Sequence, residues 1–114
     1  MENHSLLKIN ISSTDKTGHD LMYEKIVVLA RKSGISGVTV YRGIMGYGSS
    51  NKIEAVRFWE LTEKLPVVIE IIDTLEKIES FYSSIETLLQ ESEKGCLVSI
   101  QPITILLQKS GRKK

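Results

Sequence analysis

This chain of 114 residues contains few of the residues that form disulfides, metal sites or cofactor contacts: one cysteine, two histidines and one tryptophan. Its cysteine, Cys96, has no partner for an internal disulfide, and because an apolar pair follows it we expect a small buried side chain. Neither His4 nor His19 lies in a cluster of thiols or carboxylates at ligand spacing. The sequence therefore predicts no metal site, no catalytic residue and no enzymatic activity.

Long apolar runs and an excess of one charge are also absent. No run approaches the roughly 18 apolar residues that span a bilayer, and the first residues lack a signal-peptide pattern, so we expect a cytoplasmic protein without direct membrane insertion. Lysine and arginine number 15 against 14 acidic residues and are interspersed with them, which argues against nucleic-acid binding. Only residues 109–114 form a basic polar tail, following a single domain over residues 1–108.

Four segments have the pattern of β-strands. Apolar and polar residues alternate over 7–11, which is typical of a strand with one buried face. Residues 37–45 and 65–72 are rich in β-branched side chains and predict two further strands. The last strand is expected over 98–107, with a bulge or an edge position at Pro102, where the alternation changes phase.

Two further segments have the apolar spacing of helices. The first is expected over residues 21–33, opened by Asp20, whose carboxylate can cap free N–H groups, and closed by Gly34. The second carries an apolar stripe over residues 78–89 and follows the third strand, with Asp73 or Thr74 as its cap. Glu70 is interpreted as an edge or interface charge.

The order βαββαβ predicts an α+β fold of the ferredoxin-like kind, a four-stranded antiparallel sheet with two helices on one face. The helices account for one sheet face. The last three strands contain more apolar residues than that face needs, so we expect the second face to meet another subunit.

Glycines on and after the second strand mark a candidate binding segment. Gly43, Gly46 and Gly48 leave backbone N–H groups open to an anion, although such glycines serve turns or bulges just as often. Arg42 precedes them and has two interpretations of equal weight, pairing with a phosphate or with a neighbour's carboxylate.

The connection over residues 49–64 is longer than a hairpin requires, which favours contact with something else. Its apolar side chains include Ile53, Val56, Phe58 and Trp59. Two interpretations stay open: Ile53, Val56 and Trp59 dock on the domain, or a mobile loop presents Phe58 and Trp59 to a partner protein.

Residues 35–48 and 65–73 resemble the corresponding segments of PII signalling proteins and, more closely, the PII-like branch known as domain of unknown function 190. The resemblance extends over residues 34–107. It implies a homotrimer with sheets packed inward and effector clefts between subunits, for which an adenine nucleotide is the candidate ligand. It also implies a loop that reports to a target protein such as a membrane transporter or an enzyme.

Carried over by position, the resemblance puts Gly37 and Thr39 beside the cleft between subunits, while Gly46, Tyr47 and Gly48 open the signalling loop. The complete expected effector-binding set is Gly37, Thr39, Arg42, Gly43, Gly46, Tyr47 and Gly48. The loop has no tyrosine between Ser49 and Lys64, so nucleotidylation of the kind known in PII proteins is not expected.

Three alternative functions exist for the same fold. An acylphosphatase-like hydrolase needs an arginine phosphate loop after the first strand, where residues 12–19 offer only Lys16. An RNA-recognition sheet needs exposed aromatic side chains on its central strands, and residues 7–11 and 67–72 have none. A structural or interaction module without a small-molecule ligand is the third alternative.

Overall fold

The computed structural model describes residues 3–56 and 64–112. The long strands are β1 (His4–Ser12), β4 (Gly37–Arg42), β7 (Pro66–Thr74) and β8 (Leu97–Ile103). The helices are α1 (Met22–Lys32) and α2 (Leu75–Glu91). Two small ribbons pair β2 (Lys16–Thr17) with β3 (Asp20–Leu21), and β5 (Met45–Gly46) with β6 (Glu54–Ala55).

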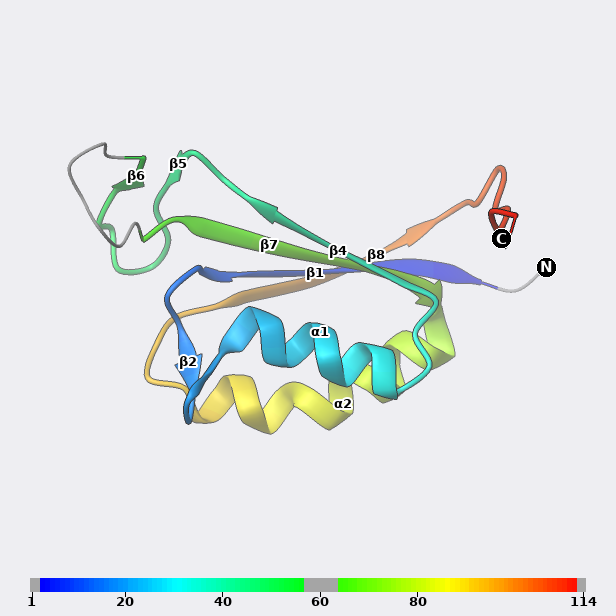
Figure 1. Ribbon diagram of the computed structural model, residues 1–114, viewed down its shortest axis with the longest axis horizontal. Coiled ribbons are helices and arrows are strands. Elements are labelled where there is room, and N and C mark those ends of the chain that lie inside the picture. Colours follow the sequence, from blue (N-terminus) through cyan, green and yellow to red (C-terminus); the bar gives the residue numbers. More distant parts are fainter. Residues whose placement is uncertain (1–2, 57–63, 113–114) are drawn as a thin grey trace.

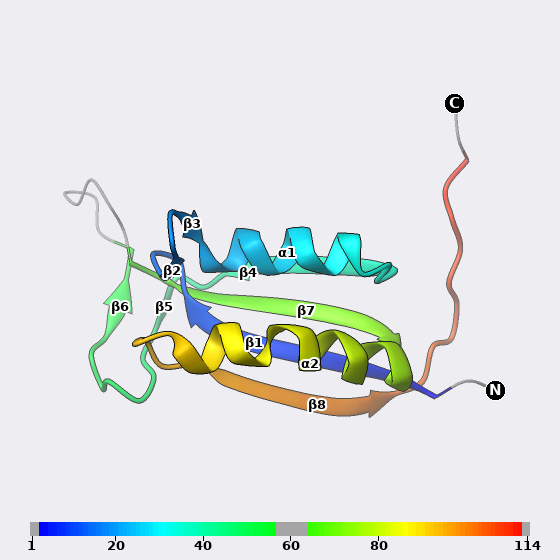
Figure 2. The same cartoon turned by 90° about the horizontal axis from the view of Figure 1, so that it is seen from below.

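The long strands form one antiparallel sheet in the order β4-β7-β1-β8. Both helices lie on the same face of this sheet, as the two perpendicular views show (Figures 1 and 2). The α+β, ferredoxin-like prediction is therefore confirmed. In this order β4 and β8 are the edge strands, and Pro102 lies on β8, where its missing N–H is tolerated.

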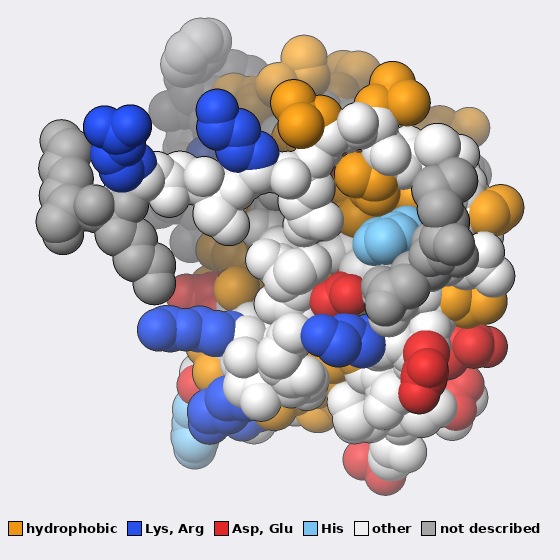
Figure 3. All heavy atoms as spheres, turned by 90° about the vertical axis from the view of Figure 1, so that its right-hand side faces the viewer, with side chains coloured by type: hydrophobic (Ala, Val, Ile, Leu, Met, Phe, Trp, Pro, Cys, Tyr) orange, Lys and Arg blue, Asp and Glu red, His pale blue; other side chains and the backbone are white. Residues whose placement is uncertain are grey.

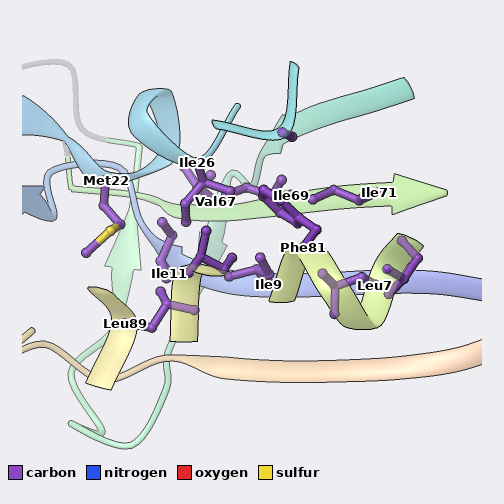
Figure 4. Packing of buried hydrophobic residues seen from close by; sticks show 13 residues of the cluster. Leu7, Ile9, Ile11, Met22, Ile26, Val67, Ile69, Ile71, Phe81 and Leu89 are labelled. Carbon is purple, nitrogen blue, oxygen red and sulfur yellow. The ribbon is translucent and has the colours of Figure 1, made fainter. Parts of the chain in front are cut away.

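The core lies between the sheet and the helices (Figure 4). Every second residue of the two central strands points into it, because side chains alternate across a strand. The strands contribute Leu7, Ile9, Ile11, Val67, Ile69 and Ile71, and the helices contribute Met22, Ile26, Ala30, Ile78, Phe81, Ile85 and Leu89. The other face of the sheet points away from the helices and is called the outer face below.

The helix ends agree with the sequence only in part. Gly34 follows α1 with a φ of +80°, the left-handed conformation expected of it. Asp20, however, does not cap α1: Leu21 holds the N-cap position, and the N–H of Met22 donates to the carbonyl of Asp15 at 2.7 Å. The β2–β3 ribbon places Asp20 in a strand, where its side chain cannot serve as the cap.

Three further predictions need correction. The second expected strand is interrupted, since β4 ends at Arg42 and β5 is a separate strand paired with β6. The last strand ends at Ile103, and residues 104–108 continue without pairing to the sheet. Cys96 is exposed and not buried, because it lies in the connection between α2 and the edge strand β8.

The outer face is less apolar than the sequence predicts. Val38 and Val40 pack against the core on the helix side of the sheet, so they add no apolar surface to the outer face. Lys8 and Glu70 form a 3.9 Å ion pair in the middle of it, so Glu70 is a central and not an edge charge. Apolar side chains flank this polar row on both sides: Leu6, Tyr41, Val68, Ile72 and Leu97.

A core substitution tests this layering. Ile69→Ala removes a side chain with 0% exposure at the centre of the sheet and should lower the free energy of unfolding by about 2–5 kcal/mol. Ile44→Ala, at a position with 78% exposure, is the matched control and should change it by less than about 0.5 kcal/mol. Urea denaturation measures both, and equal effects would contradict the assignment of the core.

Candidate functional site

The expected effector residues lie along one edge of the sheet and its continuation. Gly37 and Thr39 are at the start of β4 and Arg42 at its end, whereas Gly46 belongs to β5. A strand rises about 3.3 Å per residue, so the two ends of β4 are roughly 16 Å apart. The structure therefore separates the predicted set into two groups, one at each end of β4.

A cavity of about 400 Å³ lies beside the first group on the outer face. Gly37, Thr39 and Tyr41 of β4 line it together with Glu70 and Ile72 of β7. The remaining wall comes from the segment after β8, through Ile105, Leu107 and Gln108. The cavity combines apolar walls with a hydroxyl and a carboxylate, a combination typical of small-molecule sites.

A second cavity of about 410 Å³ adjoins the first at the start of α2. Ser36 and Gln108 line both cavities, so they lie at the junction. The second is the more charged of the two, with walls that include His4, Asp73, Glu76 and Lys77. Together the cavities follow the end of the sheet from β4 to α2.

Asp73 fixes the position of Gly37 at this junction. Its carboxylate accepts hydrogen bonds from the N–H groups of Ser36 at 2.9 Å and Thr74 at 2.7 Å. Burial works against ionisation of this carboxylate, but the two N–H groups and the charge of Lys77 outweigh it, so the pKa of Asp73 lies below its usual value of 3.8. Asp73 thus joins the chain ahead of β4 to the start of α2, and this pair of hydrogen bonds is called the Asp73 clamp below. Thr74, the other expected helix cap, caps α2 by accepting from the N–H of Lys77.

The second group packs against Pro66. The N–H of Gly43 donates to the carbonyl of Pro66 at 2.7 Å, so it is already occupied. A Cβ added to Gly43 would lie 2.9 Å from Cγ of Pro66, and one added to Gly46 would lie 3.3 Å from the same atom. Close approach of the two segments explains both glycines, whereas Gly48 has no neighbour within 4 Å of an added Cβ.

The base of the long connection is anchored to the domain. The hydroxyl of Ser12 donates to Oε2 of Glu54 at 3.0 Å, and the N–H of Val56 donates to the carbonyl of Ile44 at 3.1 Å. Oγ of Ser49 lies close to Gly95, since a Cβ there would be 2.7 Å from it. The α2–β8 connection therefore borders the base of the long connection, a contact that no sequence pattern indicated.

Apolar side chains remain exposed on this base. They include Ile44, Met45, Tyr47, Ile53 and Val56. One of the two interpretations required Ile53 and Val56 to dock on the domain. Both side chains are exposed, so they do not dock fully. Phe58 and Trp59, the expected partner contacts, lie outside the described residues, so their role stays a prediction.

Two negative findings concern the described residues alone. Residues 3–56 and 64–112 contain no group of three histidine, cysteine, aspartate or glutamate side chains that could hold a metal ion. No helix in the same ranges is long and apolar enough to cross a membrane.

The four-stranded antiparallel sheet with both helices on one face defines one class of structure, the PII-like fold. The family model of domain of unknown function 190, described as Uncharacterized ACR, matches residues 4–105, and the chain belongs to this family. A UPF0166 protein of Aquifex aeolicus (strain VF5) is 37% identical over 81 residues, which cover 71% of this chain and 77% of the relative.

Two solved structures share the fold. CPII, a nitrogen regulatory PII-like protein from Thiomonas intermedia K12 solved with ADP, AMP and bicarbonate, superposes with a TM-score of 0.60 at 15% identity, covering 89% of this chain and 88% of that one. A putative PII-like signaling protein from Thermus thermophilus gives 0.59 at 14% identity, covering 90% and 88%. The fold is PII-like, and one of its structural neighbours binds nucleotides.

The Asp73 clamp predicts a pH-dependent stability. Asp73→Asn replaces one acceptor oxygen by an amide donor, which leaves a backbone N–H unpaired and should cost about 1–3 kcal/mol at pH 7. Because the folded-state pKa is lowered, the carboxylate stabilises the protein above pH of about 4, and this stabilisation disappears as the pH falls through the folded-state value. Urea denaturation at several pH values should therefore show the difference from wild type shrinking in acid.

Asp20→Asn is the matched control for the clamp. This carboxylate lies 4.0 Å from Lys25 and its side chain is 64% exposed, so the change should cost less than about 1 kcal/mol. A gap between wild type and Asp73→Asn that stays constant from pH 7 to acid would contradict the clamp.

The contact with Pro66 predicts that Gly43 does not tolerate a side chain. Gly43→Ala should destabilise the protein by about 1–3 kcal/mol, because the rigid proline ring cannot move aside. Gly48→Ala, with open space around it, should be nearly neutral. Adding Pro66→Ala to Gly43→Ala should recover part of the loss. Thermal denaturation of wild type, Gly43→Ala, Pro66→Ala and the double variant measures this coupling. Strict additivity of the two changes would disprove the steric explanation.

Proposed function

We propose that this chain is a non-enzymatic regulatory protein of the PII-like kind. It assembles as a homotrimer, binds a small effector between subunits, and signals to a target protein through residues 49–64. The observation that carries this proposal is the position of β4. One unpaired strand edge runs from the cavity beside Gly37 and Thr39 to the anchored base of the long connection.

An adenine nucleotide is the proposed effector. CPII, which has the same fold, was solved with ADP and AMP, and that likeness supports the choice. A cavity of about 400 Å³ falls within the usual range for small-molecule sites. Arg42 is exposed at the far end of β4, where a guanidinium can pair with a phosphate. The occupied N–H of Gly43 reduces the anion-binding role expected from the sequence, while Gly46, Tyr47 and Gly48 remain in the proposed site.

The unpaired edge of β4 also supports the homotrimer. β4 pairs only with β7 among the described strands, and apolar side chains flank the ion pair on the outer face. Closed cyclic assembly covers such surfaces without leaving open ends. A neighbouring subunit would then complete the cleft along β4.

Nothing in the described residues favours an acylphosphatase-like hydrolase. The segment after β1 forms the β2–β3 ribbon, and Asp15, just ahead of β2, is buried, with its carboxylate accepting from the N–H of Ser12 at 3.0 Å. A buried carboxylate in place of a cationic cradle disfavours an anionic substrate there.

Titration with AMP, ADP and ATP tests the effector. Calorimetry should give a dissociation constant below about 1 mM for at least one nucleotide, and Arg42→Ala should weaken it by about ten- to a hundredfold, the loss of one charge-assisted hydrogen bond. Arg31→Ala, at an exposed arginine in the last turn of α1, is the matched control and should bind as wild type does. No binding below millimolar concentration would leave a ligand-free interaction module as the better description.

The same titration reports on signalling. Trp59 is the only tryptophan of the chain, so its fluorescence follows residues 49–64 alone. A quenchable emission that shifts when nucleotide is added would support a loop that responds to the effector. An emission that resists quencher in the free protein and ignores the nucleotide would contradict it.

A further inference from the structure

The segment after β8 has an unusual surface. Residues 104–108, called the arm below, contain three consecutive apolar residues, Ile105, Leu106 and Leu107. Leu106 is 95% exposed and Leu107 is 82% exposed, more than any other large apolar side chain in the described part of the chain. Exposed leucines of this kind usually mark a surface that another molecule covers.

The arm crosses the width of the sheet. It leaves the edge strand β8 at Ile103, yet Leu107 and Gln108 line a cavity together with β4, the opposite edge strand. Three strand spacings of about 4.8 Å separate these edges, roughly 14 Å, and five extended residues span about that length. In Figures 1 and 2 the chain accordingly runs from β8 along the end of the sheet, away from the helices.

The residues of the arm differ in what they border. Ile105 is half-buried and, like Leu107, lines the cavity on the outer face of its own sheet. Leu106, between them, lines neither cavity and is almost fully exposed. The chain bends at Leu106, between the two residues that border the cavity.

We propose that Leu106 is an anchor between subunits. It packs on the outer sheet face of a neighbouring copy of this chain, and this contact holds Ile105, Leu107 and Gln108 over the cavity. The inference rests on the homotrimer proposed above and adds which segment closes it. The cavity wall formed by the arm is then in place only in the assembled protein.

The lack of net charge on the arm and at the centre of the outer face favours a second copy of this chain as the partner. The arm contains no charged residue, and the outer face is neutral at its centre, because Lys8 and Glu70 compensate each other in a 3.9 Å ion pair. Apolar side chains on either side of that pair, among them Leu6 and Ile72, offer the contact that a leucine needs.

Symmetry also favours a second copy. Each chain offers one arm and one outer face, so every copy donates one contact and receives one, and such a head-to-tail interface can close into a ring. Figure 3 shows the end of the molecule where the arm passes: hydrophobic side chains gather in its upper part, and acidic ones in its lower part, toward the helices. The apolar zone thus lies on the side where the proposed neighbour would pack.

Light scattering after size exclusion tests the anchor. Wild type should have three times the chain mass of 12.8 kDa at micromolar concentration, and Leu106→Asp should have the mass of one chain, because a carboxylate would be buried in an apolar contact. Val28→Asp, an exposed apolar position on α1, is the matched control and should leave the mass at three chains. A monomeric wild type would overturn the homotrimer and the anchor together. A trimeric Leu106→Asp would overturn the anchor and leave the homotrimer standing.

Crosslinking gives an independent answer that does not depend on a destabilising change. In a Cys96→Ser background, Leu106→Cys is combined with Leu6→Cys, a residue of the outer face, and the protein is oxidised. Covalent bands of two and three chains on a non-reducing gel should appear only when both cysteines are present. Monomer bands alone from a trimeric protein would contradict the proposed contact.

Discussion

The antiparallel pairing of β1 with β7 is the interaction on which the other elements depend. The two strands are in register from His4 with Thr74 to Ser12 with Pro66, over nine residues each. Because one register places every second side chain of both strands on the same face, a slip by one residue would turn the whole apolar set to solvent. The helices can cover the sheet, and β4 and β8 can add to it, only while this register holds.

The same pairing sets the position of the candidate site. It brings the end of β7, with Ile72 and Asp73, next to the start of β1, and β4 begins opposite Ile72. Asp73 then ties the chain ahead of β4 to this point through the N–H of Ser36. The cavities that share Ser36 are therefore a product of strand register, since no local motif builds them.

Local periodicity was sufficient to predict the sheet and both helices, because alternation and helical spacing are properties of neighbouring residues. It was not sufficient where distant segments meet. Asp20 has the chemistry of a helix cap, but a hydrogen bond from Met22 to Asp15, seven residues away, replaces it. Gly43 and Gly46 resembled anion-binding glycines, and their reason is Pro66, twenty or more residues later. The arm was expected to be strand, but the pairing of β8 with β1 ends at Ile103, one residue beyond the phase change at Pro102.

The β5–β6 ribbon keeps the domain independent of the turn that the ribbon closes. Gly46 pairs with Glu54, and the hydroxyl of Ser12 holds Glu54, so the two stems of the ribbon stay together whatever lies between them. The closure entropy of the turn over residues 47–53 changes only slowly with its length. The length and sequence of this turn can therefore change at little cost to the stability of the domain.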